Sequence, residues 1–198
     1  ACNMDVIDNY YKNALLDGLC NDYKGYWQRT HGEKENLLKL SLSRQAIPHV
    51  VTYAYKGKGI TKDFVLKEYD GLINGHAVHD ADGVKGYTSG LYVDYDADKD
   101  LVADKDTMSI MWTRGASIIV PKTKASTMYI SNNSKVNIVC EGFNSITIYL
   151  YDESHVTLED MDEESFVIIY KYGKDATISK GNYCLCKKVK IFDKELKL

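Results

Sequence analysis

The chain has 198 residues, of which 44% are hydrophobic and 27% are charged, and its formal net charge is −3. This length suits one large or two small domains, and the composition is that of a globular chain rather than a disordered one. The small negative charge argues against general nucleic-acid affinity, and no apolar run approaches the roughly 20 residues that cross a bilayer.

The first part of the chain, residues 1–69, predicts a small helical domain. Apolar and aromatic residues recur there at helical spacing, Pro48 suits the first turn of a helix, and Thr61 can cap another. The expected helices cover residues 4–28, 33–42 and 48–57, with a short fourth helix beginning after Thr61. We expect the aromatic side chains of this helical head to form its core.

Residues 70–115 are rich in glycine and aspartate, and we expect them to form a junction. Short strands are predicted within it at Leu72-Ile73, at Tyr87 to Val93 and at Met108 to Trp112.

The junction contains a run of alternating acids, at Asp94, Asp96 and Asp98. Calcium loops use oxygen ligands at such alternating positions. However, Lys99 stands where the EF-hand pattern has glycine, and Lys105 stands where it has glutamate. We therefore interpret the run as a solvated acidic loop and expect no cofactor, with calcium as the alternative.

A second group in the junction consists of His76, His79, Asp80 and Asp82. Two histidines three positions apart, with two aspartates, could hold a metal ion or act as acid and base. The spacing matches no established metal motif, because no glutamate stands between the histidines and no third histidine follows. These four residues and the three aspartates of the acidic run are the candidate metal ligands of the junction.

The last part of the chain, residues 116–198, repeats about every ten residues. Each unit has a small or polar residue, a short β-branched alternation and a polar turn. Successive anchors are 10 or 11 positions apart, at Val136, Ile146, Val156, Val167, Ile178 and Val189. A unit this short cannot bury its apolar face alone and must stack on its neighbours. The repeat therefore predicts a single-stranded, β-helix-like solenoid with two units in each coil. An antiparallel meander fits the turn chemistry as well.

The repeat carries a tyrosine pattern of twice this period, at Tyr129, Tyr149, Tyr151, Tyr170 and Tyr172. Separations of 20 or 21 positions place these residues beside one another in stacked coils, and strand alternation turns them outward. Such a ladder either stiffens the sheet through cross-strand aromatic pairs or presents a recognition surface to a partner.

Charge changes along the expected solenoid. Residues 152–164 contain seven acids and no base, whereas residues 171–197 contain eight lysines against three acids. The lysine-rich tip could dock on something anionic, although a solvated capping coil explains it equally well.

No nucleophile, phosphate-loop, dinucleotide or zinc-finger motif is present. Carboxylates of the solenoid could include a pair that cleaves sugars, and their separation in space would decide it. The candidates are Glu141, Asp152, Glu153, Glu159 and Asp160. The five cysteines have no framework spacing, which indicates free thiols in a reducing compartment. Ala1-Cys2 could instead be the remnant of a lipoprotein cleavage site, and Met4 could be the native start.

Two patches together resemble a known group of proteins. One runs from Leu19 to Trp27, and the other runs from Ile73 through Asp80 and Gly86 to Tyr92. With the repetitive β tail, they resemble uncharacterised proteins encoded by phages, prophages and mobile elements of gut Bacteroidales. The insertion Val84-Lys85 departs from that pattern. The resemblance implies a phage or mobile-element context and no known activity.

We therefore expect an α+β chain in which a helical head (1–69), a junction (70–115) and a short β-solenoid (116–198) follow one another. The expected function is that of a non-enzymatic structural or adaptor protein that binds a protein partner or self-associates. The alternatives are a carbohydrate-binding or carbohydrate-cleaving solenoid and a metal-dependent junction. We expect it in the bacterial cytoplasm or the virion, rather than anchored as a lipoprotein.

Overall fold

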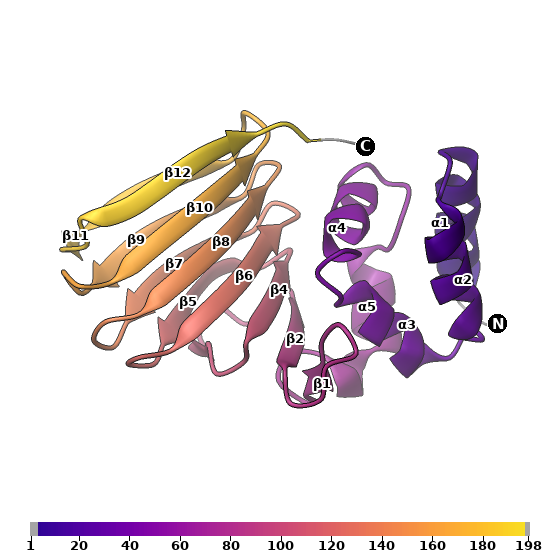
Figure 1. The fold of residues 1–198 in the computed structure, drawn as a ribbon, viewed down its shortest axis with the longest axis horizontal. Helices are drawn as coiled ribbons and strands as arrows, with labels where there is room; N and C mark the ends of the chain where they lie inside the picture. Colours follow the sequence, from indigo (N-terminus) through magenta and orange to yellow (C-terminus); the bar gives the residue numbers. More distant parts are fainter. Residues whose placement is uncertain (1–3, 197–198) are drawn as a thin grey trace.

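The computed structural model describes residues 4–196, so Cys2, the residue on which the lipoprotein alternative depends, lies outside the described residues. Within them, five helices in the N-terminal part precede a β-solenoid of about five turns. Figure 1 shows the helices gathered on one side of the solenoid, with α4 and α5 between α1 and the strands.

The helices of the head are α1 (Met4–Leu16), α2 (Asn21–Arg29), α3 (Lys34–Ser41), α4 (Ile47–Tyr55) and α5 (Lys62–Glu68). The single helix expected over 4–28 is in fact two helices. Gly18 separates them with a φ of 88°, a left-handed conformation that glycine adopts without steric penalty. Pro48 lies in the first turn of α4, and the Thr61 side chain caps α5 by accepting a hydrogen bond from the Phe64 amide.

The strands of the solenoid alternate between two sheets. They are β1 (His79–Asp80), β2 (Thr88–Val93), β3 (Leu101–Val102), β4 (Thr107–Met111), β5 (Arg114–Val120), β6 (Ala125–Ser131), β7 (Lys135–Cys140), β8 (Ser145–Tyr151), β9 (His155–Met161), β10 (Phe166–Tyr172), β11 (Thr177–Cys184) and β12 (Lys188–Lys194). The seven-stranded sheet has the order β1-β2-β4-β6-β8-β10-β12, and the five-stranded sheet has the order β11-β9-β7-β5-β3.

Pairing between neighbouring solenoid strands is parallel, except that β1 pairs antiparallel with β2. This arrangement excludes the antiparallel meander. The parallel strands begin at Thr88, inside the segment expected to be a junction, because β2 and β4 extend the same sheet as β6. The strand expected at Leu72-Ile73 is absent, and a short 3-10 helix occupies Asp70–Leu72 instead.

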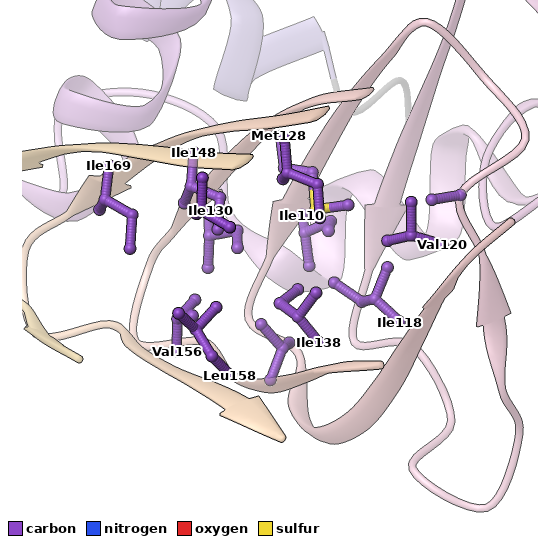
Figure 2. Close-up of a cluster of buried hydrophobic side chains, with 14 of the residues drawn as sticks. Ile110, Ile118, Val120, Met128, Ile130, Ile138, Ile148, Val156, Leu158 and Ile169 are labelled. Atoms are coloured by element: carbon purple, nitrogen blue, oxygen red, sulfur yellow. The ribbon is translucent and has the colours of Figure 1, made fainter. Parts of the chain in front are cut away.

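The core of the solenoid lies between the two sheets. Figure 2 shows its aliphatic side chains pointing toward one another, Ile130 and Ile148 from one sheet and Ile138 and Val156 from the other. All four are completely buried. Each such side chain contributes about 1.5–3 kcal/mol on leaving water, so the inward alternation of the repeat is the main source of solenoid stability.

Serines at the starts of the repeat units satisfy backbone groups at the corners of the coils. The Ser134 hydroxyl accepts a hydrogen bond from the Thr113 amide, the Ser154 hydroxyl accepts one from the Ser134 amide, and both serines are fully buried. A buried amide without an acceptor is costly. Ser134 and Ser154 are therefore structural residues of these turns.

The head packs against the outer face of the seven-stranded sheet. Leu38, Val51 and Phe64 from the helices belong to one buried cluster with Met111 and Tyr129 from the sheet. The head therefore covers some of the outward-facing side chains of this sheet and leaves the others exposed.

Candidate functional site

The expected tyrosine ladder forms stacked columns of rings. The ring centroids of Tyr129 and Tyr149 are 4.6 Å apart with an interplanar angle of 8°, and those of Tyr149 and Tyr170 are 5.1 Å apart at 20°. Tyr151 and Tyr172 form a second column, at 4.7 Å and 9°. Because the rings cover one another's faces, the ladder presents ring edges and hydroxyl groups to its surroundings.

The five ladder tyrosines differ in exposure. Tyr129 and Tyr151 are only 4% and 3% exposed, because they pack in the cluster shared with the head. Tyr149, Tyr170 and Tyr172 are partly exposed. The surface expected from all five residues is therefore offered to solvent by three of them, which the sequence pattern did not distinguish.

A cleft of about 1200 Å³ lies between the ladder and the head. The ladder side of its lining consists of Tyr129, Tyr149, Tyr151 and Tyr172, and the head side includes Tyr23, Tyr26, Leu40, Gln45 and Pro48. Two parts of the chain that are far apart in sequence thus form one aromatic concavity.

The cleft also carries charges of both signs. The backbone amide and Nε of Arg44 donate hydrogen bonds to the Asp82 carboxylate, at 2.9 and 2.5 Å. The guanidinium lies 5.3 Å from the centre of the Tyr87 ring. Lys39 and Lys85 line the same cleft. Arg44 is therefore held in one orientation while its side chain remains 56% exposed.

Tyr151 lines this cleft, and its hydroxyl is buried and has no hydrogen-bond partner within residues 4–196. Burial raises the pKa of Tyr151 far above its ordinary value, and the neighbouring Tyr172 acts in the same direction. The group is therefore a neutral phenol that can donate and accept. Buried polar atoms in folded proteins nearly always have a partner, so an unpaired one calls for an explanation.

A second concavity lies within the head. It has a volume of about 320 Å³, and Tyr10, Trp27, His49 and Tyr53 are among its lining residues. The His49 ring stacks on Tyr53 at 4.1 Å, and its Nδ1 lies 2.6 Å from the Tyr10 hydroxyl. Burial lowers the pKa of His49. The neutral ring then accepts the Tyr10 hydrogen bond. Of the aromatic residues expected to form the core of the head, Tyr10 is buried and Trp27 borders this cavity, whereas Tyr26 is exposed.

The structure does not gather the candidate metal ligands. In the stretch from residue 4 to residue 196, no group of three or more histidine, cysteine, aspartate or glutamate side chains is arranged to hold a metal ion. His79 is buried, and its Nε2 lies 2.9 Å from the Leu72 carbonyl oxygen. Asp80 accepts a hydrogen bond from the Gly86 amide. His76 lies in the loop before β1.

The acidic run is a loop between β2 and β3. Asp94 has a φ of 47°, and the Asp96 carboxylate accepts a hydrogen bond from the Asp98 amide at 2.9 Å. This is the local bonding of an Asx turn, in which an aspartate side chain bonds the backbone two residues on. It gives the Asp96 carboxylate a local structural role in the loop.

Asp152, one of the solenoid carboxylates considered for sugar cleavage, has a structural role. Its carboxylate accepts hydrogen bonds from the amides of Asn132 and Asn133, at 2.6 and 3.1 Å, and from the Ser154 hydroxyl. The two asparagines adopt left-handed φ values of 55° and 58°. Asp152 thereby holds the turn of the adjacent coil.

Comparison of the chain with protein-family models, with curated proteins and with solved structures gave no match. The site is therefore interpreted from its own geometry. None of the helices within residues 4–196 combines the length and the apolar character needed to cross a membrane.

Proposed function

We propose that this protein is a non-enzymatic interaction protein, which receives an extended peptide segment of a partner protein in the cleft between the tyrosine ladder and the head. The observation that carries the proposal is the unpaired, buried hydroxyl of Tyr151, a residue of the aromatic wall of the cleft. An unpaired buried hydroxyl is costly, and an acceptor supplied by a ligand removes that cost.

A peptide suits the chemistry of the ladder. A peptide backbone offers alternating donors and acceptors, and phenolic hydroxyls act as both. Tyrosine also provides large, rigid contact area at a small loss of conformational entropy, which is why recognition surfaces favour it. Arg44 at the same cleft adds a fixed cation that can bond a carboxylate or carbonyl oxygen of the peptide.

Carbohydrate binding is the alternative. It is favoured by the presence of Gln45, Arg44 and Asp82 beside aromatic rings, since amide, guanidinium and carboxylate groups can bond sugar hydroxyls. Against it, the stacked ladder rings cover one another's faces, so few open faces remain for a sugar ring to lie on. A peptide, which can use ring edges and hydroxyls, fits this geometry better.

Two finer features belong to the proposal. A repeat of about ten residues, with two units in each single-stranded coil, is supported by the pairing of Val136 with Val156 and of Tyr149 with Tyr170. A phage or mobile-element setting is supported by the resemblance of the two sequence patches. In that setting the head would serve as an anchor and the cleft would hold the partner.

The test is a selection for ligands that depend on the cleft. A random peptide library displayed on yeast is selected against the protein, and a glycan array is probed in parallel. Tyr172→Ala and Arg44→Ala change the cleft, whereas Tyr55→Ala changes an exposed tyrosine outside its lining. We expect selected peptides to bind at least about tenfold more weakly to the cleft variants, a loss of about 1.4 kcal/mol, and normally to Tyr55→Ala.

Equal binding to all three variants would place the peptide site elsewhere and contradict the proposal. Glycans that bind the protein and are lost with Tyr172→Ala would establish the carbohydrate alternative instead.

A further inference from the structure

Among the described residues, no strand covers the solenoid core beyond β12. Ile191 in β12 pairs in register with Ile169 in β10, so both occupy the same inward position in successive coils. Ile169 is completely buried, whereas Ile191 is 51% exposed. The difference arises because β12 covers Ile169, while no strand in the described part of the chain covers Ile191.

The backbone of this end is open as well. β12 is the last strand of the seven-stranded sheet and pairs with β10 alone within residues 4–196. The outer edge of a terminal strand presents unpaired amide and carbonyl groups, which can pair with an added strand. Phe192 extends the aromatic column, with its ring 5.5 Å from that of Tyr170. Its outer face is the next stacking position.

Charge indicates which kind of strand this edge accepts. β12 carries Lys188, Lys190 and Lys194, and the residues from 171 to 197 contain eight lysines against three acids. Acid-to-base pairing already joins the last two coils, because Lys187 contacts Glu163 at 2.7 Å and Lys188 contacts Glu164 at 3.5 Å. An acidic strand added beside β12 would continue this pairing of acidic and basic side chains between neighbouring strands.

A second copy of the chain fits this edge poorly. Two copies related by a twofold axis would bring their β12 strands together antiparallel. A pairing centred on Ile191 would set Lys188 of each copy opposite Lys194 of the other, and like charges directly opposite one another destabilise a strand pair. Stacking tail to head is blocked, because the antiparallel β1 and the helices cover the beginning of the sheet. Lysines on an edge strand commonly prevent self-association in this way.

We propose that the outer edge of β12 binds an acidic, extended segment of a partner protein, which adds one strand to the seven-stranded sheet. The register specifies the segment. Acidic residues would lie beside the three lysines of β12, apolar residues beside Val189 and Ile191, and an aromatic residue beside Phe192. This surface is distinct from the cleft, and the inference does not rest on the proposed cleft function.

The test uses a fluorescein-labelled synthetic peptide, Glu-Val-Glu-Ile-Tyr-Thr-Glu, which matches the seven residues of β12. A scrambled peptide of the same composition is the control for charge alone. Fluorescence anisotropy with the full chain should show saturable binding of the patterned peptide, at least about tenfold tighter than the scrambled one. Binding should weaken with added salt. Lys190→Glu and Lys194→Glu should each weaken it further, while Tyr55→Ala, at an exposed tyrosine of the head, should leave it unchanged.

Equal binding of the patterned and scrambled peptides, or no binding at about 1 mM peptide, would overturn the proposal. These two outcomes need only the unmodified chain, so they hold even if a lysine variant fails to fold. Sedimentation of the protein alone is the companion measurement. A dimer that Ile191→Lys dissociates would show that a second copy occupies the edge, and would also overturn the proposal.

Discussion

Tyr151 stacks face to face on Tyr172, with ring centroids 4.7 Å apart and planes inclined by 9°, although the two residues belong to successive coils. Tyr151 is buried in the cluster shared with the head, whereas Tyr172 is partly exposed at the cleft. The two stacked rings therefore connect the packing of the head on the solenoid to the surface that we propose binds a partner.

The first prediction concerns the stability of the ladder. Tyr149 stacks most closely on Tyr129 and Tyr170, so Tyr149→Ala removes these two contacts and a more distant one to Tyr172. Each contact contributes about 0.5–1.5 kcal/mol beyond area burial, so the free energy of unfolding should fall by about 1–3 kcal/mol. Tyr149→Phe keeps the rings and should change it by less than about 0.5 kcal/mol. Urea unfolding measures both, and equal effects of the two substitutions would show that the stacking is not stabilising.

The second prediction concerns the unpaired hydroxyl. Tyr151→Phe keeps the ring and its stacking on Tyr172 while it removes a buried polar atom that has no partner within residues 4–196. The free energy of unfolding should rise by about 1 kcal/mol in the absence of a ligand. Thermal and urea unfolding of the purified variant provide the measurement. A clear loss of stability would mean that the hydroxyl has a structural partner in solution, such as an ordered water molecule.

The third prediction separates neighbouring carboxylates. Asp152→Ala should lower the free energy of unfolding by about 2–4 kcal/mol, because the amides of Asn132 and Asn133 lose their acceptor. Glu153→Ala, at the next and exposed position, should change it by less than about 0.5 kcal/mol. If the two substitutions had equal effects in chemical unfolding, Asp152 would not be holding the turn.

The fourth prediction is a pH dependence. Burial lowers the pKa of His49 from 6.5, and the charge of Asp17 opposes this shift only in part. Between the folded and unfolded pKa values the unfolded chain binds more protons, so stability should be complete above 6.5 and decrease as the pH falls below it. His49→Gln retains an acceptor for Tyr10 and does not titrate. The stability difference between protein and variant should therefore shrink or reverse on acidification, and parallel curves for the two proteins would contradict the assignment.

The solenoid could be predicted from the sequence because its period is regular. Val136 and Val156 are 20 positions apart and are paired in the structure. The first coils were missed because their period is irregular. Tyr92 pairs with Ile110, 18 positions on, and Ile110 pairs with Ile130, 20 positions on. Strands near Tyr87 to Val93 and Met108 to Trp112 were expected in this segment, but their membership of the solenoid sheet was not.

The site was predicted only in part. Tyrosines with the ladder spacing could be identified, but alternation alone does not tell which outward residues another part of the chain covers. Tyr129 and Tyr151 are buried by helices more than 60 positions away in sequence, a tertiary relationship that no local pattern encodes. The sequence did not indicate that Arg44 lines the cleft, because that position depends on its bond to Asp82 and on the nearby ladder. The break at Gly18 was the one local feature that the sequence could have revealed.

The central claim is that the unpaired Tyr151 hydroxyl is a binding group of the cleft. Its most direct test is calorimetric titration of the tightest selected peptide into the unmodified protein, Tyr151→Phe and the control Tyr55→Ala. Loss of one buried hydrogen bond predicts roughly tenfold weaker binding to Tyr151→Phe, with stability equal or higher, and unchanged binding to Tyr55→Ala. Equal affinity for all three proteins would contradict the claim and leave Tyr151 as a purely structural residue of the ladder.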